Sequence, residues 1–505
     1  MKRTSDVLII GAGILGCFAA RSLSRYALEI NVIEKREDVC CGITKANTGI
    51  IYRGYDQHPG SLKAALCKKA SDHFPSLCEE LDIPYRKTGL LMLSFGPRAD
   101  RVFQKKMEQG KENNIPDIQI LDESQVYQME PLLCDGIRSA LYAENTYTVN
   151  PWEMGIAAYE NAMSNQVHFY FGQEAMRIAR MDTGFLVETK DHTYTASRLI
   201  CCAGLTADTV WEMLSKPSVK ILPLAADYLV FDRSVGDSIS HVISVEPEEK
   251  GDGITLVPTV DGNILAGPTR RSIKDPAHCT AAASGCCTAA PGSETAADVG
   301  GILELQQKCQ KLIPSLSPSM IIRSFGAVRP NPYYAEPDGT LSQKSINDFQ
   351  ILEEDGFFAL IGIKTPGITC ADELGRYLAQ RLIGSLEHKP PLNPSFSPSR
   401  KGILRLSDLL RDDPGLTANL PQSAPADYFE IICRCEHISK GEVLEAIRRG
   451  ATTIDGIKRR TGAGMGRCQG GYCMEKILHL LKEQTGKDVY EITKDGPGSE
   501  ILIKL

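Results

Sequence analysis

Short apolar runs alternate with longer amphipathic segments along most of the chain, and this pattern predicts strands and helices in turn. Residues 6–10 and 29–34 have the apolar character of buried strands, and residues 14–25 between them have apolar positions at helical spacing. Further strands are predicted at 167–171, 185–189, 198–202 and 228–231, and further helices at 61–81 and 372–383. This mixture predicts an α/β protein with a Rossmann-like core.

Two segments lack both periodicities. Residues 278–299 are rich in Ala, Ser, Thr, Cys and Gly, and residues 388–427 are punctuated by prolines. We interpret the second segment as an interdomain linker, because proline-rich chains act as extended spacers. Its one amphipathic piece, at 403–410, is expected to pack on a neighbouring domain.

Length and charge limit the number of domains and the classes of ligand that the chain is expected to have. A chain of 505 residues favours several domains, because single hydrophobic cores stop growing near about 250–300 residues. A net charge of −7 argues against a nucleic-acid-binding surface. The apolar run near the N-terminus passes directly into a glycine motif without a cleavage site, and no run approaches the roughly 18 apolar residues of a membrane span. We expect a cytoplasmic protein, associated with a membrane at most peripherally through a partner.

The sequence GAGILG follows the first predicted strand and opens the first predicted helix. Gly11 permits the sharp turn, Gly13 lets a pyrophosphate approach the backbone, and Gly16 lets the helix lie close to the strand. The helix N-terminus then offers N–H groups to the phosphates. Glu34, at the end of the second strand, can accept hydrogen bonds from a ribose. This context indicates a dinucleotide site but does not separate FAD from NAD.

Longer segments carry a resemblance that does separate them. GITKANTGIIYRGYD at 42–56, ICCAGLTAD at 200–208, GDGITLVPTVDGNILAGPT at 251–269, FGAVRP at 325–330 and GFFALIGIKTPGIT at 356–369 stand in the chain in that order. Together they resemble the glycerol-3-phosphate dehydrogenase and L-2-hydroxyglutarate dehydrogenase branch of the D-amino-acid-oxidase-like superfamily. The resemblance implies non-covalent FAD and the following contact residues: Gly11, Gly13, Ile14, Gly16, Glu34, Lys35, Thr44, Lys45, Asn47, Thr48, Ala175, Ala203, Gly204, Gly362, Pro366, Gly367, Ile368 and Thr369.

The same resemblance implies a small anionic substrate beside the flavin. Arg329 stands where the family uses an arginine for the substrate's anionic group, and Lys364 is similar in position to a lysine at the flavin edge. Arg53 is either substrate-facing or surface-exposed. Tyr52 replaces the histidine that the family usually has, so it supplies either a hydroxyl at the site or buried aromatic packing.

Four cysteines near the C-terminus form a candidate ligand set. Cys433 and Cys435 make a C-x-C pair, and Cys468 and Cys473 make a C-x4-C pair. Four thiolates suit either a zinc ion or an iron–sulfur cluster, although C-x-C is less typical of zinc knuckles. Predicted helices occupy 440–449, 453–460 and 474–485. The phrase GAGMGRCQGGYC resembles the bacterioferritin-associated ferredoxin-like [2Fe–2S] domain, which implies that cluster. The same domain follows the flavin domain in the large subunits of anaerobic glycerol-3-phosphate dehydrogenases.

The predicted plan is a Rossmann-like FAD-binding domain with an interleaved α+β substrate domain, followed by a small helical [2Fe–2S] domain. The FAD-binding parts are expected at about 1–75, 150–215 and 320–387, and the substrate domain at 76–149 and 216–319. The linker follows at 388–427, the cluster domain at 428–486 and a tail at 487–505.

Three functions remain open at this point. The first is oxidation of sn-glycerol 3-phosphate, with electrons passing from FAD through the cluster to a second redox subunit, either NAD(P)/FAD-dependent or quinone-linked. The second keeps the chemistry but uses a 2-hydroxy acid, an amino acid or an imino acid. The third is a non-catalytic electron-transfer subunit.

Overall fold

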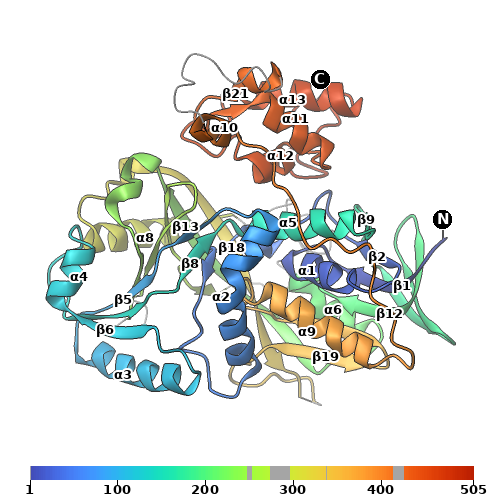
Figure 1. The fold of residues 1–505 in the computed structure, drawn as a ribbon, viewed down its shortest axis with the longest axis horizontal. Coiled ribbons are helices and arrows are strands. Elements are labelled where there is room, and N and C mark those ends of the chain that lie inside the picture. Colours follow the sequence, from blue (N-terminus) through green and yellow to red (C-terminus); the bar gives the residue numbers. More distant parts are fainter. Residues whose placement is uncertain (1, 247–252, 273–295, 337, 413–425, 505) are drawn as a thin grey trace.

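The computed structural model describes residues 2–246, 253–272, 296–336, 338–412 and 426–504. It contains two large sheets side by side and a small C-terminal group of helices above them (Figure 1). The alternation of strands and helices in the sequence is thus confirmed as an α/β fold. Most of the predicted 278–299 segment lies outside the described residues, which resume before helix α8 (Val299–Leu312).

The first sheet has eight strands and forms the Rossmann-like core. Its order is β10-β11-β12-β1-β2-β9, with β20 beside β12 and β19 beside β20. Strands β1, β2, β9, β12 and β20 pair in parallel, and a parallel sheet is covered on both faces, which explains their continuous apolar runs. The strands are β1 (Lys2–Ile10), β2 (Ile30–Ile33), β9 (His168–Tyr170), β10 (Arg177–Met181), β11 (Gly184–Glu188), β12 (Thr193–Cys201), β19 (Gln350–Glu354) and β20 (Phe357–Ile361).

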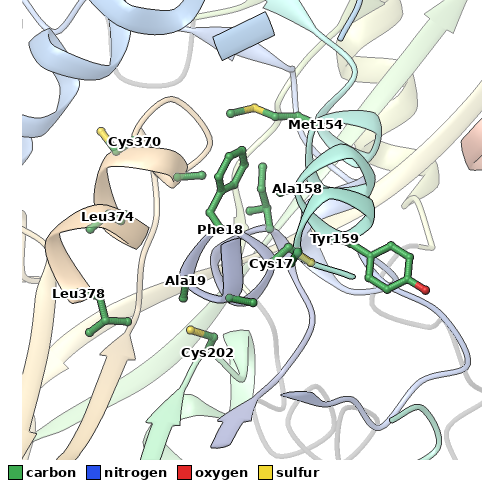
Figure 2. Close-up of a cluster of buried hydrophobic side chains, with 14 of the residues drawn as sticks. Cys17, Phe18, Ala19, Met154, Ala158, Tyr159, Cys202, Cys370, Leu374 and Leu378 are labelled. Carbon is green, nitrogen blue, oxygen red and sulfur yellow. The ribbon is translucent and has the colours of Figure 1, made fainter. Parts of the chain in front are cut away.

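Helix α1 (Ile14–Leu23) lies between α5 (Pro151–Ser164) and α9 (Ala371–Gly384) on one face of this sheet. Figure 2 shows Phe18 of α1 between Met154 of α5 and Cys370, which precedes α9. Gly375 of α9 lies so close to α1 that an added Cβ would stand 2.6 Å from the Phe18 carbonyl oxygen. Helix α2 (Leu62–Leu81) also contributes to this core, and α6 (Ala207–Glu212) packs on the opposite face.

The second sheet has nine strands in the order β17-β13-β16-β15-β14-β5-β7-β6, with β18 beside β13. Its strands are β5 (Leu90–Ser94), β6 (Ile118–Asp122), β7 (Ser139–Ala143), β13 (Val219–Phe231), β14 (Val242–Val245), β15 (Thr255–Pro258), β16 (Ile264–Ala266), β17 (Arg271–Ser272) and β18 (Ile321–Tyr334). Helices α3 (Pro97–Glu112), α4 (Glu123–Met129) and α8 accompany it, and β3 (Ile50–Ile51), β4 (Tyr85–Lys87) and β8 (Tyr147–Val149) form a small separate sheet. The sequence predicts that the FAD-binding parts resume at about residue 320, but β18 pairs with β13 along its whole length and belongs to this second sheet.

The first part of the predicted linker is a strap bound to the flavin-type domain. Ala27 N–H donates to the Pro391 carbonyl (2.9 Å), and Asn161 Nδ2 lies 3.1 Å from the carbonyl oxygens of Ser397, Pro398 and Ser399. Arg400 pairs with Glu160 at 2.7 Å. Residues 388–405 therefore do not act as a free spacer. Residues 413–425 of the predicted linker lie outside the described part of the chain.

The C-terminal module contains α10 (Leu406–Asp412), α11 (Lys440–Arg448), α12 (Ile454–Thr461), α13 (Met474–Thr485) and the strand pair β21 (Ile431–Cys433) and β22 (Ile438–Ser439). Ser439 and Glu442 form the capping box that opens α11. Ile492 of the predicted tail is buried in the module's core, together with Ile403 from the strap. The module therefore extends on both sides of the predicted 428–486. Within the described residues, no helix combines the length and apolar character needed to span a bilayer.

Candidate flavin cavity and cysteine cluster

The glycine turn between β1 and α1 has the close contacts that its sequence predicts. Gly11 has φ +101°, and a Cβ there would lie 2.6 Å from the Cys202 carbonyl oxygen. A Cβ on Gly16 would lie only 1.9 Å from the Gly11 carbonyl oxygen. Gly13 is the N-cap residue of α1 and has no side chain to cap the first-turn N–H groups. The turn is therefore built for close backbone approach.

Glu34 closes this turn from the end of β2. Its two carboxylate oxygens accept hydrogen bonds from the backbone N–H groups of Ala12 (2.7 Å) and Arg36 (2.9 Å). Burial raises the pKa of Glu34, and these two N–H donors oppose the rise. Each oxygen keeps a second lone pair that a ribose hydroxyl can use.

A cavity with about 1060 Å³ of empty volume, including its solvent-open part, begins at this turn and runs between the two sheets. Residues from both domains line it. Those predicted from the sequence are Gly13, Ile14, Thr44, Asn47, Thr48, Tyr52, Gly204, Arg329, Lys364, Pro366, Gly367, Ile368 and Thr369. The sequence does not predict the lining residues Ile43, Ile50, Cys202, Tyr228, Thr255, Pro268 and Ile363.

Two cations meet at one end of the cavity, Arg329 from β18 and Lys364 from the loop after β20. Burial lowers the pKa of Lys364, and the neighbouring guanidinium of Arg329 lowers it further. Lys364 Nζ donates to Ser345 Oγ at 3.1 Å. Among the described lining residues there is no carboxylate and no imidazole. This end of the cavity is therefore suited to an anion.

Tyr52 lies beside these cations. Burial raises the pKa of its phenol to about 12, although nearby Arg329 and a hydrogen bond with Thr48 act in the opposite direction. The phenol stays protonated near neutral pH and can donate a hydrogen bond, but it is no base. Tyr52 thus packs against the hydrophobic clusters on both sides of it and also presents a hydroxyl toward Thr48.

Four predicted site residues lie elsewhere. Arg53 pairs with Asp72 (2.5 Å) and Asp117 (2.8 Å), so its guanidinium is occupied away from the cavity. Lys45 Nζ lies 2.5 Å from Asp495 of the C-terminal module. Lys35 pairs with Glu174, and Ala175 is buried in the core on the other face of the first sheet. The structure does not bring these side chains to the cavity wall.

Two further predicted residues shape the wall without lining it. A Cβ on Gly362 would lie 2.5 Å from the Pro332 side chain, and Ala203 lies against the Gly11 turn. Lys63 was missed. Its buried Nζ donates to the Thr365 carbonyl at 2.9 Å, directly behind the cavity wall. Burial lowers its pKa to about 8, with Lys364 adding to the effect. A lysine on the buried stripe of α2 was the available signal.

The four C-terminal cysteines come together in two pairs. Cys433 is in hydrogen-bond contact with Cys473, and Cys435 with Cys468. Within the described residues, no three Cys, His, Asp or Glu side chains converge to hold a single metal ion. A [2Fe–2S] cluster needs four cysteines for two irons, so two pairs suit it better than a tetrahedral zinc ion.

The module is docked on the flavin-type domain by buried charges. Arg459 and Arg460 of α12 both pair with Asp38, from the loop after β2. Burial alone would raise the pKa of Asp38, but the two guanidinium groups lower it to about 2. Arg467 and Arg233 make further pairs between the module and the second-sheet domain, with Asp232 and Glu436 respectively. The cysteine pairs thus lie beside both large domains.

Comparison with known proteins agrees with this geometry. Residues 6–381 match the family "FAD dependent oxidoreductase", and residues 431–483 match the "BFD-like [2Fe-2S] binding domain". A glycerol 3-phosphate dehydrogenase of Caloramator mitchellensis is 35% identical over 98% of both chains. An L-2-hydroxyglutarate dehydrogenase of Caenorhabditis elegans is 27% identical over 52% of this chain and 63% of its own length. Among solved structures, the L-alpha-glycerophosphate oxidase of Mycoplasma pneumoniae with FAD bound has a TM-score of 0.69, with 25% identity, and covers 79% of this chain and 98% of its own.

Proposed function

The chain belongs to the FAD dependent oxidoreductase family, is of the glycerol-3-phosphate dehydrogenase type and carries a [2Fe–2S] binding domain, and from this premise we propose that its substrate is sn-glycerol 3-phosphate. The single observation that carries the proposal is the match to a glycerol 3-phosphate dehydrogenase over nearly the whole of both chains. That relative shares the flavin-type domain and the region of the cysteine module alike. The L-2-hydroxyglutarate dehydrogenase match stops at about half of this chain.

The cavity's charge supports a phosphorylated substrate. Arg329 and Lys364 provide two cations and no lining carboxylate among the described residues opposes them. A phosphate dianion placed between them would restore the lowered pKa of Lys364, because a nearby anion favours the ammonium form. Arg329 can hold two phosphate oxygens at once through its planar guanidinium. A neutral polyol would gain none of these contacts.

The hydroxyl groups of the substrate face the other polar residues of the cavity. Tyr52, whose phenol remains protonated, donates a hydrogen bond, and Thr48 is its neighbour. These contacts orient the carbon that loses hydride, and the apolar wall at Ile43, Ile50 and Ile363 limits water around it. The proton of the oxidised hydroxyl group leaves to solvent at the open part of the cavity. When bound, FAD supplies a hydride acceptor and the [2Fe–2S] cluster a one-electron acceptor, which is the chemistry that divides a two-electron oxidation into single-electron steps.

Residues of this chain fit both groups. Gly11–Gly16 and Glu34 would hold the pyrophosphate and ribose of FAD, and Thr44, Asn47 and Gly367 lie along the rest of its cavity. Cys433, Cys435, Cys468 and Cys473 would hold the cluster. We propose that electrons leave through a redox partner, as the presence of a one-electron module implies.

Reduction of the bound flavin, followed by its loss of absorbance, tests which compound is the substrate. The flavin-loaded protein is mixed anaerobically with sn-glycerol 3-phosphate, glycerol, L-2-hydroxyglutarate and a set of amino and imino acids. Rapid flavin bleaching by sn-glycerol 3-phosphate alone is expected, with glycerol inert because it lacks the phosphate. If a 2-hydroxy acid, an amino acid or an imino acid bleached the flavin faster, that compound and not sn-glycerol 3-phosphate would be the substrate. Bleaching by none of them would indicate a non-catalytic electron-transfer subunit.

A further inference from the structure

The cysteine site has a buried side and an exposed side. Cys433 and Cys473 are each only 1% exposed and belong to the module's core. Cys435 is half-buried, and Cys468 is exposed. A cluster held by these four cysteines therefore presents one edge to solvent, at Cys468. This edge is where an electron can leave the protein with the least intervening chain.

An aromatic ring between two cations flanks this edge. Tyr472, directly before Cys473, is 40% exposed. The guanidinium carbon of Arg434 lies 4.4 Å from the centre of its ring, and Lys476 Nζ lies 5.3 Å from it. Among the described residues, neither Arg434 nor Lys476 forms an ion pair. We call Arg434, Cys468, Tyr472 and Lys476 the exit edge.

Several other cations of the module are paired with carboxylates. Arg459 and Arg460 are paired with Asp38, Arg449 with Glu160 and Glu445, and Lys440 with Asp427. Those pairs hold the module together or dock it. The chain as a whole is acidic, with a net charge of −7. At the exit edge, two cations without an ion pair among the described residues thus flank an exposed cluster ligand, in a chain that is acidic as a whole.

We propose that the exit edge is the docking surface for an acidic one-electron carrier protein. The proposal rests on the cluster of the proposed function. Unpaired cations steer an acidic protein toward the edge, and exposed Tyr and Arg side chains are residues that contribute strongly to binding once covered. In the transfer step, one electron passes from the reduced cluster to the oxidised centre of the carrier. No bond forms or breaks, and two carriers are needed for each two-electron oxidation.

Cytochrome b5, an acidic haem protein, and cytochrome c, a basic one, are suitable probes. The cluster-loaded protein is reduced with dithionite, freed of excess reductant and mixed with each cytochrome in a stopped-flow instrument. Chemical reduction bypasses substrate oxidation, so the outcome does not depend on whether sn-glycerol 3-phosphate is the substrate. Binding of oxidised cytochrome b5 to the oxidised protein, measured calorimetrically, gives a readout without turnover.

Arg434→Gln combined with Lys476→Gln should slow cytochrome b5 reduction about tenfold at low salt, with weaker binding and no slowing of cytochrome c. The difference should vanish near 1 M salt, where the screening length is about 3 Å. Lys487→Gln is the matched control, because this exposed lysine lies beyond the far end of the helix that carries Lys476, and it should change the rate less than about twofold. Glu475→Gln, which removes a carboxylate from the same turn, should accelerate the reaction.

Equal slowing of both cytochromes, or a cytochrome b5 rate and affinity that the double variant leaves unchanged, would overturn the proposal. Equal slowing would mean that the two cations serve the cluster itself. Because Arg434 lies between two ligands, the paramagnetic signal of the reduced cluster is recorded for each variant. If the double variant lacks that signal, the test uses Lys476→Gln alone, which should slow the reduction of cytochrome b5 by a smaller factor.

Discussion

Asp38 of the flavin-binding domain and Arg460 of the C-terminal module form a two-point salt bridge, although 422 positions separate them in the chain. Arg460 Nη1 lies 2.6 Å from Asp38 Oδ2, and Nη2 lies 2.8 Å from Oδ1. Both side chains are at most 2% exposed. Asp38 precedes the segment that lines the flavin cavity from Ile43 to Thr48. Docking of the module and the shape of the cavity are therefore linked through one loop.

Removing this carboxylate should release the module. Asp38→Asn leaves the buried Arg460 without a counter-charge and leaves Arg459 with Asp495 alone, and breaking a buried pair in this way costs about 3–5 kcal/mol. We expect a lower free energy of unfolding in urea and slower passage of electrons from the reduced flavin to the cluster. Asp427→Asn is the control, because it removes an exposed pair with Lys440 and should cost less than about 1 kcal/mol. Equal effects of the two variants would show that Asp38 does not dock the module.

The same pair predicts a pH dependence. The pKa of Asp38 is lowered from 3.8 to about 2, so the stabilisation is fully present above about pH 4 and is lost as the pH falls from 4 toward 2. The difference in unfolding free energy between the native chain and Asp38→Asn should stay constant from pH 7 to 5 and shrink by about 2 kcal/mol through that acid range. A difference that is unchanged at pH 3 would contradict the lowered pKa.

Gly16→Ala should weaken flavin binding without unfolding the protein. The new Cβ would stand 1.9 Å from the Gly11 carbonyl oxygen, so the phosphate-binding turn must move, at a cost of about 1–3 kcal/mol. The flavin content of the purified protein and fluorescence titration of the flavin-free protein measure the loss. Gly384→Ala, at the end of α9, meets no atom within 4 Å and should leave flavin affinity unchanged. If Gly16→Ala bound flavin with unaltered affinity, the glycine turn would not be part of the flavin site.

Arg329→Ala should impair substrate use far more than stability. Loss of one charged contact in a desolvated site is worth about 2–5 kcal/mol, which appears as a lower kcat/KM for sn-glycerol 3-phosphate. Flavin content should stay normal. Arg177→Ala, on an exposed strand, is the matched control and should behave as the native chain does. Normal kcat/KM in Arg329→Ala with flavin bound would assign Arg329 a structural role only.

The residues that sequence predicted well act through local patterns. The glycine turn and the α2 and α9 helices each depend on neighbours a few positions away, and the boundaries of α13 agree with the predicted 474–485. The C-x-C and C-x4-C motifs are also short, although the contacts that join Cys433 to Cys473 and Cys435 to Cys468 are not. Lys45 and Arg53 were misplaced because their carboxylate partners, Asp495 and Asp117, lie far away in the chain. The local pattern of apolar and polar residues does not indicate an ion pair between such distant positions.

The strap shows the same limit. Prolines predict a segment without helix at residues 388–405, as the structure has it, but they do not reveal that Asn161 binds three successive carbonyl groups of that segment. A spacer and a bound strap have the same local conformation. A bound strap differs only in having a protein surface beneath it. Here the helix that provides Asn161 lies more than two hundred positions earlier in the sequence.

If the substrate drives a relay from flavin to cluster, one anaerobic titration should show the two groups being reduced in turn. Stepwise addition of sn-glycerol 3-phosphate to the protein loaded with FAD and iron is followed by flavin absorbance and by paramagnetic resonance. We predict that the flavin bleaches and that the signal of a reduced [2Fe–2S] cluster then appears. In Cys468→Ser the flavin should still bleach and the cluster signal should be absent. Zinc in place of iron in anaerobically purified protein, or a flavin that sn-glycerol 3-phosphate leaves oxidised, would contradict the account.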